Sequence, residues 1–198
     1  MKKIALIILT IGFGIASLTS AYAAVFTFQP TPRADMWDLD HTYYYSWGIN
    51  WSAPSTIESA TLSIDNINDW RAENGDILWV TLLNNATAGV VRSTDNENPT
   101  NAFAGAITAG NAALIGTYTD TAEPYGAVIP GDNVSFSVPS TYFSWMQDGN
   151  FGFGFDPDCH YYNTGMKLTV TTAPVPEPAT MSLLGMGILG LFGLRRRS

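Results

Sequence analysis

Apolar and polar residues alternate in several short runs along the chain. Apolar side chains occupy every second position in the segments 43–51, 60–64, 134–138 and 166–170. Successive side chains of an extended strand point to opposite faces, so each run can bury one face and leave the other in water. The segment 76–83 is more continuously apolar, which is typical of a strand in the interior of a sheet. The pattern therefore predicts a set of short, half-buried strands.

The residues between these runs favour an all-β fold. Gly, Pro, Asn and Asp separate the runs, and the best helical candidate, 140–146, is short. Short strands with turn residues between them are typical of a single antiparallel β-sandwich, similar to a jelly roll. Residues 84–111 are rich in Asn, Ala and Gly, so we expect a loop-rich excursion there with one or two weak strands.

The N-terminus has the features of a secretory signal peptide. These are a basic pair (Lys2-Lys3), an apolar run (4–18) and a small-x-small cleavage signature (Ala21-Tyr22-Ala23). They predict that signal peptidase cleaves before Ala24 and that the chain is exported.

The C-terminus also has three parts. These are a Pro-rich motif (Val175-Pro176-Glu177-Pro178), an uncharged apolar run (180–194) and a basic end (Arg195-Arg196-Arg197). As a helix the apolar run would span roughly 22 Å, which is short for a hydrocarbon core of about 30 Å. The three arginines are expected on the cytoplasmic side of a membrane. A plain C-terminal membrane anchor is the simplest interpretation of this pattern.

This tail resembles the PEP-CTERM sorting domain of Gram-negative bacteria, over about residues 174–198. The resemblance implies recognition by an exosortase, a membrane-embedded, transpeptidase-like enzyme that cleaves near the Pro-Glu-Pro motif. It implies transient anchoring in the inner membrane through the apolar helix. It also implies a final place in the cell envelope or outside the cell, in connection with exopolysaccharide and biofilm.

The two end segments divide the chain into a signal peptide (1–23), a β-sandwich domain (24–173) and a sorting signal (174–198). Five of the nine Lys and Arg residues but only one of the 17 Asp and Glu residues lie in the end segments. The domain therefore carries 16 acids and 4 bases, a net charge of −12. Nucleic acid is excluded as a partner, because binding to phosphates needs a basic surface. Divalent cations suit the charge of the domain better.

Two segments of similar sequence contain the only two histidines. The first is Asp38-Leu39-Asp40-His41, and the second is Asp156-Pro157-Asp158-Cys159-His160. If the segments meet, the carboxylates of Asp38, Asp40, Asp156 and Asp158 can bind Ca²⁺, and the histidines would shift the preference towards Zn²⁺ or another transition metal. Asp-Pro-Asp is also ordinary turn chemistry, so turns that bind no metal are the alternative. Asp69 and Asp76 form a second, weaker cation candidate.

Aromatic residues offer a possible surface for sugars. The segment 151–155 alternates Phe and Gly, which predicts a core strand whose bare glycine face admits a flat ring or another backbone. The alternative is a sugar-stacking platform that uses Trp47, Trp51, Trp70 or Trp145. His41, His160, Trp51 and Trp70 are the candidate ligand contacts. Because Cys159 is the single cysteine, an internal disulfide is excluded. Its side chain is expected to be a small buried group, with a thiol that pairs between chains or a reactive thiol as the alternatives.

No catalytic motif is present: the sequence lacks Gly-x-Ser-x-Gly, His-Glu-x-x-His, a Gly-rich phosphate loop and paired-Cys metal motifs. We therefore expect a non-enzymatic surface protein with a structural or adhesive role in the exopolysaccharide layer. One alternative is a Ca²⁺-dependent carbohydrate-binding module. Another is a small polysaccharide-active hydrolase, because glycoside hydrolysis needs only two carboxylates at a suitable separation.

Overall fold

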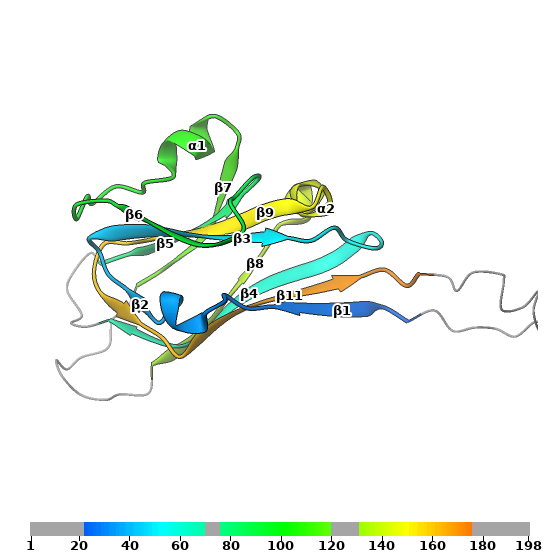
Figure 1. The fold of residues 1–198 in the computed structure, drawn as a ribbon, viewed down its shortest axis with the longest axis horizontal. Helices are drawn as coiled ribbons and strands as arrows, with labels where there is room; N and C mark the ends of the chain where they lie inside the picture. Colours follow the sequence, from blue (N-terminus) through cyan, green and yellow to red (C-terminus); the bar gives the residue numbers. More distant parts are fainter. Residues whose placement is uncertain (1–21, 70–75, 120–130, 176–198) are drawn as a thin grey trace, which may run out of the picture. The chain divides into compact units, whose positions relative to one another are not determined.

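Two antiparallel sheets face each other in the computed structural model (Figure 1), which describes residues 22–69, 76–119 and 131–175. Ala23–Pro174 form one unit by their contacts. The first sheet contains β1 (Ala24–Phe28), β11 (Gly165–Thr172), β4 (Ile57–Asp69), β10 (Tyr161–Tyr162) and β2 (Asp38–Leu39) in that order, with β8 (Asp132–Ser137) also paired to β4. The second sheet has the order β6 (Gly89–Thr94), β3 (Tyr43–Asn50), β9 (Asn150–Pro157), β5 (Leu78–Leu83) and β7 (Ala112–Tyr118). The predicted all-β antiparallel sandwich is confirmed.

Within the described ranges, helical structure is limited to short pieces between strands. They are η1 (Arg33–Met36), α1 (Ala104–Thr108), η2 (Ser140–Tyr142) and α2 (Phe143–Gln147). The last two cover the predicted helical segment 140–146. The excursion at 84–111 contains one strand, β6, and one helix, α1.

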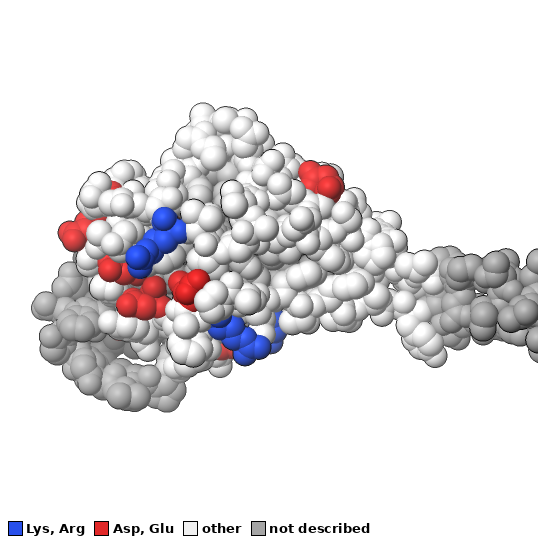
Figure 2. Space-filling view, in the orientation of Figure 1, with Lys and Arg blue, Asp and Glu red and all other residues white. Residues whose placement is uncertain are grey.

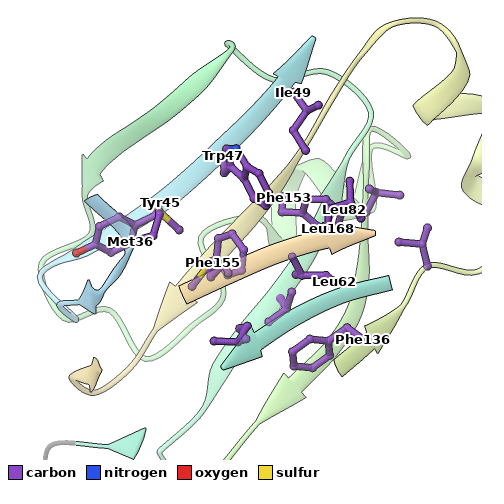
Figure 3. Close-up of a cluster of buried hydrophobic side chains, with 14 of the residues drawn as sticks. Met36, Tyr45, Trp47, Ile49, Leu62, Leu82, Phe136, Phe153, Phe155 and Leu168 are labelled. Atoms are coloured by element: carbon purple, nitrogen blue, oxygen red, sulfur yellow. The ribbon is translucent and has the colours of Figure 1, made fainter. Parts of the chain in front are cut away.

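The core lies between the sheets and follows the alternation of the sequence. The first sheet contributes Leu62, Ile64 and Leu168, which are completely buried. The second contributes Trp47 and the phenylalanines of β9, and these side chains lie in the space between the two sheets (Figure 3). The predicted interior strand at 76–83 is β5, which pairs with a strand on both sides.

The outer face of β9 is covered as well. Phe103 belongs to a second, smaller apolar cluster with Leu83, Ala86 and Ala112, outside the main core. A Cβ on Gly154 would lie 2.5 Å from the Phe103 ring, and one on Gly152 would lie 2.6 Å from the Ala86 Cβ. The glycine face thus admits a flat ring, as the sequence predicted, and the ring comes from the excursion at 84–111.

The long strand β4 separates two opposite ends of the domain. Ile57, at its start, pairs with Thr172, and Ala24 pairs with the same residue, so the first and last strands of the domain meet there. Asp69, at its end, pairs with Tyr161 of β10. The 13 residues of β4 would span up to roughly 40 Å at about 3.3 Å per residue. We call the end at Ile57 and Thr172 the terminal end of the sandwich. We call the end at Asp69 and Tyr161 the histidine end, because His160 directly precedes Tyr161.

Candidate functional site

His41 and His160 come together at the histidine end. The pairing of β2 with β10 sets Leu39 opposite Tyr161 and Asp38 opposite Tyr162. His41 follows β2 and His160 precedes β10, so the two imidazoles become neighbours, with ring centroids 5.1 Å apart and planes tilted by 49°. The structure therefore joins the histidine-bearing ends of the two similar segments.

Each imidazole faces a carboxylate. Asp38 Oδ1 and Asp40 Oδ2 lie 3.4 Å and 3.7 Å from His160 Nε2. Glu97 Oε1 lies 3.4 Å from His41 Nε2. The candidate ligand atoms of Asp40, His41 and His160 all lie within 4.8 Å of one another, and the three residues are half-buried. We call these three residues the Asp-His-His cluster.

Local hydrogen bonds orient the carboxylate of this cluster. Asp40 Oδ1 accepts a hydrogen bond of 2.8 Å from the Thr42 N–H, and the Asp40 N–H donates one of 2.9 Å to the Tyr45 hydroxyl. Burial alone would raise the pKa of Asp40, but the Thr42 hydrogen bonds and the two histidines outweigh it and hold that pKa below its ordinary value. Asp40 is therefore ionised at neutral pH.

Asp156 and Asp158 do not belong to this cluster. Asp156 is 0% exposed, and its Oδ2 accepts a 2.6 Å hydrogen bond from the Ala102 N–H. Burial, together with Asp95 and Asp158, raises the pKa of Asp156 to about 7, against the lowering effect of that hydrogen bond. Asp158 Oδ1 accepts a 3.4 Å hydrogen bond from the Ile77 N–H. The four carboxylates considered for Ca²⁺ are thus divided among different surroundings.

A second group that could hold a metal ion consists of Asp69, Asp76 and Cys159. Burial, followed by a hydrogen bond with Asp69, raises the pKa of the Cys159 thiol. A thiol with a raised pKa is protonated at neutral pH and is a poor nucleophile. Cys159 is half-buried and packs against the main core, so its surroundings are those of a structural side chain.

The tryptophans proposed for sugar stacking lie elsewhere. Trp47 is buried in the core, and Trp51 packs against Phe26 and Phe28 at ring distances of 4.9 Å and 5.1 Å. Trp145 is half-buried beside Tyr142. Trp70 lies outside the described residues.

Sequence analysis missed two exposed aromatic residues at the histidine end. Trp37 is 47% exposed and Tyr162 is 38% exposed. The Tyr162 ring stacks on His160, with centroids 5.9 Å apart and planes 6° from parallel. The signal was present in the sequence, because Trp37 directly precedes Asp38 and Tyr162 follows His160 by two positions.

Acidic side chains gather at this end of the sandwich. In Figure 2 most of the visible Asp and Glu side chains lie near the end that carries β2. An open pocket between β1 and β3 has a different character. It is lined by Thr27, Phe28, Gln29, Thr31, Trp47, Gly48, Ile49 and Gly89. None of these lining side chains is ionisable, so this pocket offers no acid or base of its own.

Parts of both end signals lie outside the described residues. In the N-terminal signal these parts are the basic pair, the apolar run 4–18 and Ala21. In the C-terminal signal they are Pro176-Glu177-Pro178, the apolar run 180–194 and Arg195-Arg196-Arg197. Ala23 and Ala24 are described, and Ala24 is the first residue of β1. Among the residues that the structure describes, no helix is both long enough and apolar enough to cross a membrane.

Comparison with known families gives one match. Residues 174–197 match the model of the PEP-CTERM protein-sorting motif. No curated protein sequence matches the chain. The motif match supports an exported, envelope-associated protein with an exosortase as its processing partner. It covers the tail only, so the role of the sandwich rests on the sandwich's own geometry.

Proposed function

We propose that the chain is a non-enzymatic surface protein with a structural or adhesive role in the exopolysaccharide layer of a Gram-negative bacterium. Signal peptidase removes the N-terminal segment before Ala24. The C-terminal helix anchors the chain transiently in the inner membrane, and the exosortase then cleaves near Pro176-Glu177-Pro178. The match of residues 174–197 to the sorting motif supports this route.

The observation that carries this proposal is that the last strand ends at the terminal end of the sandwich, opposite the histidine end. β11 ends at Thr172, paired with Ala24, and the sorting motif begins two residues later. The Asp-His-His cluster lies beyond the other end of β4, next to the pairing of Tyr161 with Asp69. When the protein is attached through its tail, the point of attachment therefore lies next to the terminal end of the sandwich. The histidine end stays available for contacts.

Processing is tested by replacing Pro176-Glu177-Pro178 with three alanines. The apolar run and the arginines stay unchanged, so the variant retains its means of membrane insertion. We expect the wild-type chain to lose Arg195, Arg196 and Arg197 from its intact mass, and the variant to keep them and stay in the inner membrane. A mature wild-type chain that still carries these arginines contradicts the processing step.

The role in the extracellular layer needs a separate measurement. Cells that lack the chain are expected to retain less exopolysaccharide and to form weaker biofilm than cells with the chain restored. Restoration with the alanine variant of the motif should fail, because that variant does not reach the surface. Equal retention in all strains would contradict the structural role while leaving the processing result intact.

Carbohydrate binding is a second candidate function, favoured by the exposed rings of Trp37 and Tyr162 beside Asp38. Aromatic faces next to carboxylates suit the apolar faces and hydroxyl groups of sugars. Binding to the cells' own exopolysaccharide should weaken in Trp37→Ala and Tyr162→Ala. Leu114→Ala is the matched control, because Leu114 is 47% exposed on β7, an edge strand of the other sheet. Equal loss in all three variants would contradict a specific site.

A further inference from the structure

We propose that Asp40, His41 and His160 form a binding site for a divalent transition-metal ion, of which Zn²⁺ is the representative. This inference goes beyond the proposed surface role and does not depend on it. Its basis is the convergence of two imidazoles and a carboxylate, with candidate ligand atoms within 4.8 Å of one another.

The distances suit a single ion. Bonds of roughly 2.0–2.2 Å from Zn²⁺ to nitrogen and oxygen place tetrahedral ligand atoms roughly 3.3 Å apart. His160 Nε2 already lies 3.7 Å from Asp40 Oδ2. The centroid of the His41 ring lies 5.1 Å from that of the His160 ring. Small side-chain rotations therefore bring all three donors to one point.

Two features of the fold orient the candidate ligands: a hydrogen bond to the Asp40 carboxylate and the stacking of the His160 ring. The hydrogen bond from the Thr42 N–H orients the Asp40 carboxylate through Oδ1 and leaves Oδ2 directed at His160. The ring of His160 stacks on Tyr162, which is itself fixed in the ladder opposite Asp38. A site with oriented ligands loses less side-chain entropy when it binds an ion.

The surrounding charges favour a cation. Asp38 Oδ1 lies 3.4 Å from His160 Nε2 and Glu97 Oε1 lies 3.4 Å from His41 Nε2. Together with Asp40 they place three carboxylates around two imidazoles, and a divalent ion would offset the repulsion among them. One more carboxylate or a water molecule can complete a four-coordinate site.

The donor types select the ion. Ca²⁺ takes six to eight oxygen ligands, whereas two of the three donors here are imidazole nitrogens. Imidazole suits Zn²⁺, Cu²⁺ and Ni²⁺. The structure therefore favours the transition-metal alternative over the Ca²⁺ site considered for Asp38, Asp40, Asp156 and Asp158.

The test is a Zn²⁺ titration of the exported chain, produced without a polyhistidine tag, purified in mild detergent and freed of metal with EDTA. We expect one ion per chain by calorimetry and by metal analysis after dialysis. His41→Gln and His160→Gln should each weaken binding by about 10-fold or more, since each removes one of few ligands. Absence of binding at submillimolar Zn²⁺ would overturn the proposal.

Two controls separate this site from the second group and from misfolding. Cys159→Ser removes the thiol of the Asp69-Asp76-Cys159 group and should leave Zn²⁺ affinity unchanged. Asp40→Asn keeps an amide oxygen for the Thr42 N–H but lowers the affinity, so it reports on the site even if a histidine variant unfolds. Loss of binding in Cys159→Ser with full binding in His160→Gln overturns the assignment. Displacement of Zn²⁺ by millimolar Ca²⁺ overturns the choice of ion.

Discussion

The two Asp-x-Asp segments resemble each other in sequence and differ in what lies over them. In each, an aromatic residue precedes the first aspartate: Trp37 before Asp38, and Phe155 before Asp156. Asp38 belongs to β2, a two-residue strand at the edge of its sheet, and its side chain is 53% exposed. Asp156 belongs to β9, the middle strand of the other sheet, and is 0% exposed. The same pattern thus gives a surface carboxylate in one place and a buried one in the other.

The difference comes from the segment that covers β9. Asp156 lies on the same outer face of β9 as Gly152 and Gly154, because alternate residues of a strand share a face. Phe103 covers that face at Gly154, and the Ala102 N–H binds Asp156. Asp38 and Asp40 also alternate with a buried residue, Leu39, and both remain partly exposed. Ligand binding is therefore expected from the aspartates of the first segment, and a structural contribution from Asp156 of the second.

The largest expected effect comes from the aromatic residues that begin the two segments. Phe155 is 0% exposed in the main core, so Phe155→Ala should reduce the free energy of unfolding by about 3–5 kcal/mol. Trp37 is about half exposed and lies outside the main core, so Trp37→Ala should cost less than about 1 kcal/mol. Urea denaturation of both variants measures the two values. Equal losses of unfolding free energy in the two variants would show that Trp37 contributes as much to the core as Phe155 does.

The next effect concerns protonation of the first aspartate in each segment. The pKa of Asp156 is raised to about 7, so native Asp156 binds a proton more tightly than unfolded Asp156, and stability is lost as pH rises towards 7. Asp156→Asn removes this loss and should stabilise the fold by about 1–3 kcal/mol near pH 8, with the gain vanishing near pH 4. The amide oxygen of the introduced Asn side chain can still accept the hydrogen bond from the Ala102 N–H.

Asp38→Asn is the matched control, because Asp38 is exposed. It should change stability by less than about 0.5 kcal/mol at either pH. Thermal melting across the pH range measures both variants. Asp156 faces the carboxylates of Asp95 and Asp158 and the Ala102 N–H. A gain in stability of Asp156→Asn that does not depend on pH would contradict the assigned protonation of Asp156.

Much of the fold could be predicted because it depends on local alternation. The runs at 43–51, 60–64 and 166–170 become β3, part of β4 and β11, with the expected apolar faces buried. The bare face of Gly152 and Gly154 also indicated a close approach. The sequence did not indicate which ring approaches, because Phe103 comes from an irregular segment without periodicity.

The site was predictable only in part, for the same reason. The sequence does not show whether the two segments meet; the pairing of β2 with β10 brings His41 and His160 together. The predicted grouping of Asp38, Asp40, Asp156 and Asp158 around one Ca²⁺ did not anticipate the cover over β9, which is a tertiary contact. Trp37 and Tyr162 were overlooked because their exposure depends on how β2 and β10 pair, which two strands of two residues each do not reveal in the sequence.

The smallest effect expected concerns the second aspartate in each segment, and it separates a local turn from a longer-range contact. Asp40 accepts a 2.8 Å hydrogen bond from Thr42, whereas Asp158 accepts one of 3.4 Å from Ile77. In EDTA, Asp40→Ala should therefore cost about 1 kcal/mol and Asp158→Ala about half of that or less, because a longer hydrogen bond is weaker. Burial raises the pKa of Asp158, so its removal also relieves an unfavourable charge. Chemical denaturation measures both losses. A larger loss in Asp158→Ala would mean that the second segment depends on its long-range contact with Ile77 more than the first segment depends on its local turn.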